Sequence, residues 1–144
     1  MQNTQVKHIM QANPVIIGAD DTLQDAARLM RENDCGILPV GTEDNLQGII
    51  TDRDIVVRAI SEGKDPKREK VRDYMTQGLH TCSETETLLS AAGKMRENGV
   101  SRLIIQRDDG KLSGILTFGR ILRKNNDREE VFGVVSSATG KKAA

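Results

Sequence analysis

The sequence is poor in aromatic residues and has no excess of positive charge, which argues against nucleic-acid binding. Its 144 residues include two Phe, one Tyr and no Trp. Proteins that bind single strands stack the bases on aromatic side chains. The 21 Lys and Arg are balanced by 21 Asp and Glu, whereas a general basic surface needs a surplus of Lys and Arg to displace counterions. No nucleic-acid partner is therefore expected.

Cysteine and histidine are also scarce. Cys35 and Cys82 are too few for a disulfide framework and do not form a CxxC motif. We expect them to be small buried thiols in a reducing compartment, with a regulatory disulfide or a redox sensor as the alternative. His8 and His80 are isolated, and no HExxH motif or Cys/His cluster is present. No metal site is predicted.

Long apolar runs are absent as well. No stretch approaches the roughly 20 apolar residues of a membrane span, and residues 1–8 lack the apolar segment of a signal peptide. We therefore expect no membrane partner and a cytoplasmic location. Hydrophobic residues make up 37% of the chain and charged residues 29%, a balance typical of a folded domain.

The strongest positive signal is an internal repeat. Residues 6–10 (VKHIM) reappear as residues 71–75 (VRDYM), and residues 31–33 recur unchanged as residues 96–98. Two copies of about 65 residues indicate a duplicated unit. Because each copy is small for independent stability, the copies are expected to bury a face against each other.

Each copy shows the same order of elements. In the first copy we predict a strand at residues 15–17 and a helix that is capped by Asp20, Asp21 or Thr22 and stops near Asn33-Asp34. Strands at 37–40 and 46–50 and a helix that begins at Thr51 follow. The predicted fold is α+β (α/β), with two tandem β-α-β-β-α repeats packed with pseudo-two-fold symmetry.

The repeats give the domain boundaries. The first repeat spans residues 6–62, a charged linker covers 63–70, and the second repeat spans 71–124. Residues 125–144 form a C-terminal tail. We expect residues 131–135 of this tail to pack on the domain or on a partner, and the stretch beyond Ser136 to be flexible.

The segment GIITDRD at residues 48–54 carries the chemical signal. Thr51 stands between a strand and a helix, and Asp54 follows three residues later. This spacing is typical of a capping box, in which each side chain bonds the backbone N–H of the other residue. The same edge also suits a ligand, because a hydroxyl and a carboxylate can bond the vicinal hydroxyls of a ribose. Both roles stay open, since a capping side chain keeps spare acceptor capacity.

The duplicated unit, the Leu38-Pro39-Val40 strand and the segment 48–54 resemble a CBS-domain pair, also called a Bateman module. The likeness covers about residues 6–124. The family's ribose signature is Gly, two hydrophobic residues, Thr or Ser, two variable residues and Asp, and Thr51 and Asp54 occupy its polar positions. The resemblance implies that they hold the ribose of AMP, ADP, ATP or S-adenosylmethionine. It implies no required cofactor.

The family also places each ligand in a cleft between the two copies. By this resemblance, Ile49 joins Thr51 and Asp54, and the other copy contributes five further residues: Gly78, Leu79, His80, Val100 and Ser101. Arg102 stands where some members place a phosphate-contacting Arg. An equal alternative is that Arg102 is a surface residue that bridges the two copies.

The second copy departs from the signature. Its segment GILTFGR keeps Thr117 but has Arg120 in place of Asp, and Phe118 adds bulk. Arg only donates hydrogen bonds and cannot accept them from ribose hydroxyls. The sequence therefore predicts one competent nucleoside site. The second cleft is then either empty or holds a phosphate through Arg102 and Arg120.

No residue set supports catalysis. The sequence contains no Ser/His/Asp arrangement, GxGxxG motif or Walker sequence. We predict no catalytic residue and no enzyme, but a regulatory homodimer that passes its ligand state to an unknown protein partner. The alternative is a dimeric interaction or stress-response protein that binds no ligand and is redox-responsive through its thiols.

Overall fold

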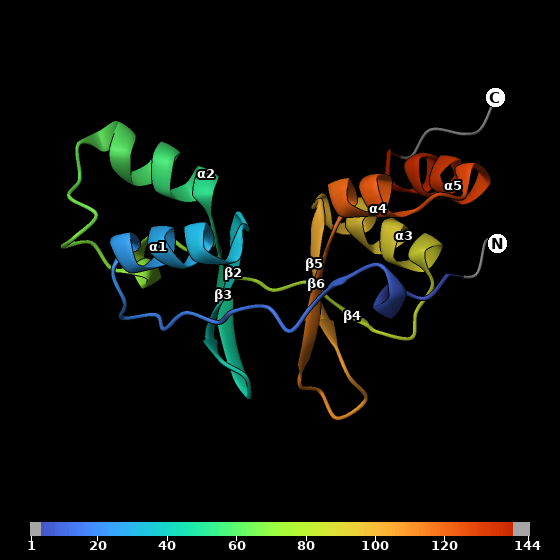
Figure 1. Ribbon diagram of the computed structural model, residues 1–144, viewed down its shortest axis with the longest axis horizontal. Coiled ribbons are helices and arrows are strands. Elements are labelled where there is room, and N and C mark those ends of the chain that lie inside the picture. The colour runs from blue at the N-terminus through green and yellow to red at the C-terminus, as the bar shows by residue number, and fades with distance from the viewer. Residues whose placement is uncertain (1–3, 140–144) are drawn as a thin grey trace. The chain divides into compact units, whose positions relative to one another are not determined.

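The structure, a computed structural model, describes residues 4–139, which form two compact units (Figure 1). Of the described residues, 14–79 make up the first-repeat unit, and 4–13 together with 80–139 make up the second-repeat unit. Each unit combines helices with paired strands, so the mixed α and β class predicted from the sequence is confirmed.

The first-repeat unit is built on a β-hairpin. Its elements are α1 (Leu23–Asn33), β2 (Ile37–Thr42), β3 (Asn45–Thr51), α2 (Asp52–Asp54), a π-helical turn (Ile55–Ala59) and two 3-10 turns (Ile60–Glu62 and Val71–Asp73). β2 and β3 pair antiparallel, with Leu38 opposite Ile50. The helical turns from Asp52 to Glu62 follow one another along the chain without a gap.

The second-repeat unit contains a four-stranded sheet in the order β1-β6-β5-β4. Its elements are a 3-10 turn (Val6–His8), β1 (Gln11–Ala12), β4 (Thr81–Ser83), α3 (Leu88–Asn98), β5 (Arg102–Gln106), β6 (Leu112–Thr117), α4 (Phe118–Lys124) and α5 (Arg128–Thr139). β4 runs parallel to β5, and the other pairs are antiparallel. Helices α3, α4 and α5 lie on one face of this sheet (Figure 1).

The prediction of a strand at residues 15–17 is wrong. Only Ile17 pairs, in a parallel bridge with Val40. Ile17 N–H donates to the Pro39 carbonyl at 3.0 Å. The chain then turns at once, since Gly18 N–H bonds the Asp21 carboxylate at 2.9 Å. A turn closed by an Asp side chain ends the ladder after one residue.

The predicted ends of the first long helix are confirmed. Thr22 and Asp25 form a complete capping box at the start of α1, and the helix ends on Asp34 in the left-handed region at φ 49°. Its equivalent α3 ends on Gly99 at φ 63°. The charged linker packs beside the start of α1, where Leu23 N–H donates to the Glu69 carbonyl at 3.0 Å.

The two compact units do not coincide with the two sequence repeats, because the segments that open the repeats are exchanged. Val6 belongs to the unit of the second repeat and Val71 to the unit of the first, and both side chains are fully buried. The segment of residues 4–12 is held in place by Val6 N–H, which donates to the Glu86 carbonyl at 2.8 Å. Each unit is therefore completed by chain from the other repeat.

Two glycines permit this exchange. A Cβ on Gly114 would lie 2.6 Å from the Met10 sulfur and 2.7 Å from the Gln11 carbonyl oxygen. A Cβ on Gly48 would lie 2.5 Å from the Thr76 carbonyl oxygen. The Gly that opens each motif, GIIT at residues 48–51 and GILT at residues 114–117, is thus needed where an exchanged segment pairs with the strand.

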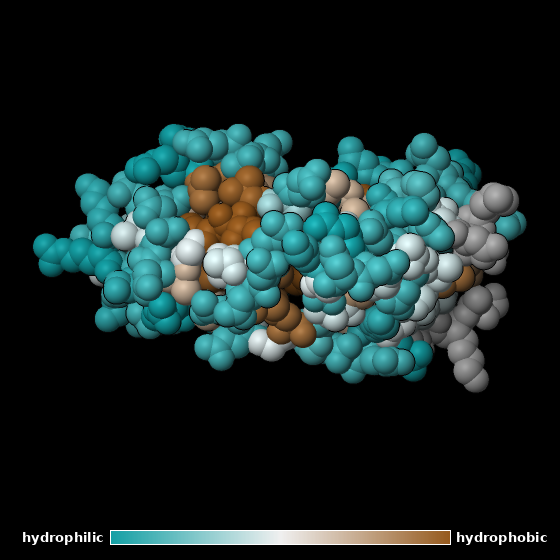
Figure 2. Space-filling view, turned by 90° about the horizontal axis from the view of Figure 1, so that it is seen from below, coloured by the Kyte–Doolittle hydropathy of each residue, from teal (hydrophilic) through white to brown (hydrophobic). Residues whose placement is uncertain are grey.

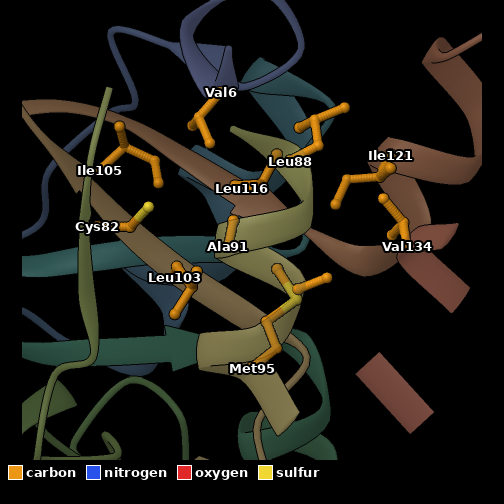
Figure 3. Close-up of a cluster of buried hydrophobic side chains, with 11 residues drawn as sticks. Val6, Cys82, Leu88, Ala91, Met95, Leu103, Ile105, Leu116, Ile121 and Val134 are labelled. Atoms are coloured by element: carbon orange, nitrogen blue, oxygen red, sulfur yellow. The ribbon is translucent and has the colours of Figure 1, made fainter. Parts of the chain in front are cut away.

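Each unit has its own core. Figure 3 shows Val6, from the exchanged segment, among side chains of α3 and β6, with Ile121 and Val134 nearby. The other core is formed by side chains of the first repeat and the exchanged Val71: Ile17, Ala19, Leu23, Ala26, Met30, Leu38, Val40, Ile50, Ile55, Ala59 and Val71. The surface seen in Figure 2 is mainly hydrophilic, with apolar side chains gathered in patches. Within residues 4–139, no helix is long and apolar enough to cross a bilayer.

Helix α5 lies beyond the second repeat and continues to Thr139, three residues past the point where the sequence predicts flexibility. Ala138 packs against the core of its unit, which explains the extra turn. Glu130 of α5 is fully buried. Its two carboxylate oxygens accept from Thr4 N–H at 3.0 Å and from Asn125 Nδ2 at 2.8 Å. These bonds compensate for the burial of the charge and join α5 to the N-terminal segment. Residues 140–144 of the predicted tail lie outside the described residues.

We predict that Gly114→Ala destabilises the protein by about 1–3 kcal/mol, because the added methyl group must displace backbone of the exchanged segment. Gly93→Ala is the matched control, since its Cβ would meet only Ser137 Oγ at 3.7 Å. In helix α3 that change is expected to stabilise by about 0.5–1 kcal/mol. Urea unfolding of both variants measures the difference. Equal stabilities would contradict the close approach at Gly114.

Candidate functional site

The capping box expected at residues 51–54 is present. Asp54 N–H donates to Thr51 Oγ1 at 3.1 Å, and Thr51 N–H donates to Asp54 Oδ2 at 2.9 Å. Thr51 is 6% exposed, and the Asp54 side chain is 13% exposed. The two residues therefore hold each other in fixed positions at the end of β3 and the start of α2.

This cap leaves bonding capacity for a ligand. Thr51 Oγ1 accepts a hydrogen bond in the cap, and its hydroxyl proton can still be donated. Asp54 Oδ2 is bonded in the cap, whereas Oδ1 has Arg58 Nε at 3.7 Å, an ion pair longer than a hydrogen bond. A hydroxyl donor and a carboxylate acceptor thus stand side by side, which suits vicinal hydroxyl groups.

The exchanged segment of residues 71–79 borders this site within the first-repeat unit. Ile49 and Thr76 exchange two backbone hydrogen bonds, of 3.0 Å and 2.8 Å. Gly78, at φ 77°, and Leu79 follow along the same segment. Ile49, Thr51, Asp54, Gly78 and Leu79 therefore all belong to one compact unit.

A further close contact shapes the edge of the site. Asp52 N–H donates to the Gly36 carbonyl at 2.9 Å. A Cβ on Gly36 would lie 2.8 Å from Asp52 Oδ2. Gly36 is the counterpart of Ser101 in the second repeat, and here only a residue without a side chain leaves room for Asp52.

The equivalent edge of the second-repeat unit is built differently. Arg120 N–H donates to Thr117 Oγ1 at 3.1 Å, as Asp54 N–H does to Thr51. The Arg120 side chain, however, donates from Nε to the Ile9 carbonyl in the exchanged segment of residues 4–12. The residue that replaces the signature carboxylate therefore fastens the chain instead of presenting an acceptor. Phe118 takes the position of Asp52 and donates its N–H to the Ser101 carbonyl at 2.9 Å.

The remaining predicted residues lie in the second-repeat unit. His80 precedes β4 and accepts from Ile104 N–H at 2.9 Å through its carbonyl. Arg102 begins β5, opposite Thr117. Val100 and Ser101 line a hollow of about 150 Å³ with Met95, Phe118, Ala138 and Thr139. This hollow is smaller than the roughly 300 Å³ of a typical small-molecule site. It stays a prediction that His80, Val100, Ser101 and Arg102 share a site with Thr51 and Asp54.

One residue beside the carboxylate was missed in the sequence. Arg58 pairs with Asp54 and also donates from Nη1 to the Tyr74 carbonyl at 3.2 Å. An acid followed four residues later by Arg on a helix is a recognisable pairing signal. The signal does not reveal the second bond, because Tyr74 is brought there by the exchange of segments.

Of the two thiols predicted to be buried, Cys82 is buried and Cys35 is only partly buried. Cys82 is 2% exposed, and burial together with the neighbouring Glu86 carboxylate raises its pKa to about 12. Cys35 is half-buried, and desolvation raises the pKa of its thiol too. Thiolates are the reactive form, so these environments disfavour redox sensing. Among residues 4–139 no three His, Cys, Asp or Glu side chains are grouped to hold a metal ion.

Comparison with known proteins gives a family match over most of the chain. The sequence model of the CBS domain matches residues 6–60 and 71–127. A protein of Methanopyrus kandleri, MK0525, is 34% identical over 85% of this chain, which spans 63% of that protein. Hypoxic response protein 1 of Mycobacterium tuberculosis is 32% identical, with 83% of this chain and 84% of that protein covered.

Solved structures agree with this match. A crystal structure of hypoxic response protein I with two coordinated zinc ions has a TM-score of 0.70 at 32% identity, covering 85% of this chain and 99% of that one. CBSX2 in complex with AMP has a TM-score of 0.65 at 28% identity, covering 83% and 93%. A hexameric CBS-CP12 protein from bloom-forming cyanobacteria has a TM-score of 0.75 at 28% identity, covering 85% and 72%.

We predict that Cys82 resists alkylation in the native protein. With a pKa of about 12, about one thiol in 100,000 is ionised at pH 7, against a few in 100 for an ordinary cysteine. The reaction with iodoacetamide should be about a thousandfold slower than in urea, measured by mass spectrometry of the Cys82 peptide. Rapid native labelling would revive the redox alternative.

Proposed function

Because the chain belongs to the CBS domain family and carries two such domains, we propose that it is a regulatory module that binds an adenosine-containing ligand. The candidates are AMP, ADP, ATP and S-adenosylmethionine. The observation that carries the proposal is the pair formed by Thr51 and Asp54, whose mutual cap leaves a hydroxyl proton and Asp54 Oδ1 available.

The chemistry of that pair supports a sugar ligand. Vicinal hydroxyls need an acceptor and a donor at fixed separation, and a carboxylate acceptor gives the stronger, charge-assisted hydrogen bond. The capping box fixes both groups before the ligand arrives, so little side-chain freedom is lost on binding. The complex of CBSX2 with AMP supports adenosine as the nucleoside, since that protein is 28% identical to this chain.

We propose that other parts of the chain complete the site. Ile49, Gly78 and Leu79 provide apolar surface and backbone groups for the adenine. His80, Val100 and Ser101 are proposed to do the same from the second repeat, and Arg102 to contact a phosphate. We assign a catalytic role to none of these residues, and the activity that we propose is ligand binding. Its proposed location is the cytoplasm.

We further propose one nucleoside site per chain. In the second-repeat unit Arg120 provides no acceptor and is engaged with the Ile9 carbonyl. Its partner Thr117 therefore lacks the reciprocal carboxylate that fixes Thr51.

Homodimerisation is proposed through the helical turns after Asp54. Val56, Val57 and Ile60 are 58%, 47% and 49% exposed on this short stretch. Exposed apolar side chains clustered on two consecutive helical turns mark an interaction surface, and a second copy is the occupant that we propose. The hexameric CBS-CP12 protein supports self-association in this family. A dimer without a ligand, in line with the stress-response name of hypoxic response protein 1, is the alternative function.

We predict that AMP binds with one site per chain and that Asp54→Ala weakens binding by about ten- to a hundredfold, because a charge-assisted hydrogen bond of about 1.5–3 kcal/mol is lost. Isothermal titration calorimetry measures both quantities. A thermal-shift panel with AMP, ADP, ATP and S-adenosylmethionine ranks the ligands.

Asp25→Ala is the matched control for Asp54→Ala. Asp25 forms the same capping box with Thr22 on α1, so its loss removes the corresponding hydrogen bond from the N-cap backbone N–H but no proposed ligand contact. The proposal requires unchanged AMP affinity in this variant. Absence of binding to every nucleotide in the panel, with normal folding, would favour the interaction protein.

We predict a dimer in solution, with a mass near twice 15.8 kDa. Val56→Glu combined with Ile60→Glu should give monomers, since burying two carboxylates in an interface is unfavourable. Phe132→Glu on α5 is the control, because Phe132 is 57% exposed on another helix. Sedimentation velocity distinguishes the species. Monomers produced by Phe132→Glu alone would place the interface elsewhere.

A further inference from the structure

Arg58 contacts two parts of the first-repeat unit at once. Its Nε lies 3.7 Å from Asp54 Oδ1, and its Nη1 donates to the Tyr74 carbonyl at 3.2 Å. Asp54 belongs to the proposed ligand site, whereas Tyr74 belongs to the exchanged segment. The guanidinium thus joins the Asp54 carboxylate to Tyr74, which lies 16 residues after Arg58 in the chain.

That segment is well placed to respond to the site. Thr76, two residues after Tyr74, pairs with Ile49. Gly78 follows in the left-handed region, and the first-repeat unit ends at Leu79. The segment from Tyr74 to Leu79 is therefore the last stretch of this unit before the chain enters the other one.

We propose that Arg58 is a positioning residue that couples ligand occupancy at Asp54 to the order of residues 74–79. This inference rests on the proposed function, because it assigns a consequence to ligand binding at the same carboxylate. A ligand hydroxyl on Asp54 Oδ1 restrains the side chain that Thr51 already holds at Oδ2. A restrained carboxylate fixes the guanidinium, which in turn holds the Tyr74 carbonyl.

The planar fork of Arg is what the coupling needs. Two different nitrogens of one rigid group reach two partners, whereas Lys offers a single point charge. The Arg58 side chain is 50% exposed, so water can solvate the part of the guanidinium that does not face these two partners. A binding event that orders a neighbouring segment is a recognised source of coupling between sites.

Helix α1 supplies a natural comparison. There Thr22 and Asp25 form the same capping box, and Arg28 Nη1 lies 3.6 Å from Asp25 Oδ1. Among residues 4–139, Arg28 has no hydrogen bond or ion pair to a second segment of the chain. The ion pair beside a capping carboxylate is thus common to both helices, while the link to the exchanged segment is specific to Arg58.

Hydrogen–deuterium exchange of the full chain, with and without saturating AMP, tests the proposal. In the wild-type protein AMP should slow exchange in peptides covering residues 75–79 by about fivefold or more, within the usual range of coupling between sites. In Arg58→Met the slowing should fall below about twofold at AMP saturation. Arg28→Met should behave like the wild type.

Arg58→Lys separates charge from bridging. It should bind AMP with an affinity within about threefold of the wild type and yet lack the slowing at residues 75–79. Slowing retained in either Arg58 variant would overturn the inference. So would the loss of AMP binding by a folded Arg58→Lys, because Arg58 would then be a direct ligand contact. If the wild-type chain binds no AMP, the proposed function itself fails.

Discussion

The reciprocal cap between Thr51 and Asp54 is the interaction on which the functional interpretation depends. It is an ordinary helix-capping device, and it also fixes a hydroxyl and a carboxylate next to each other. A capping box uses one acceptor position of each side chain, which leaves the other atoms for a ligand. Local helix chemistry and ligand recognition are therefore compatible at these two residues.

The exchange of segments makes the two repeats depend on each other. Residues near Val6 complete the core of the second-repeat unit, and residues near Val71 complete that of the first. Each exchanged segment requires a glycine in the strand with which it pairs, Gly114 in β6 and Gly48 in β3. As a result, the exchanged segment of residues 71–79 lies beside the proposed site, where Arg58 bonds the Tyr74 carbonyl.

The repeats have diverged at corresponding positions, and the divergence has a physical effect. Where the first repeat places Asp54, the second places Arg120, whose side chain bonds the Ile9 carbonyl. At the C-terminal end, the buried Glu130 holds Thr4. The second-repeat unit thus uses both side chains to retain the N-terminal segment, whereas the first-repeat unit keeps its carboxylate at the proposed ligand site.

The sequence by itself determined the duplication, the mixed α and β class, the residue near which α1 ends and the capping box at Thr51, because each depends on local spacing and on residues close in the chain. It overestimated the strand at residues 15–17, since the turn closed by the Asp21 side chain decides where that pairing stops. Only the tertiary structure decided the exchange of segments, the need for Gly48 and Gly114 and the second bond of Arg58. These features join residues far apart in sequence, so no local pattern of residue types specifies them.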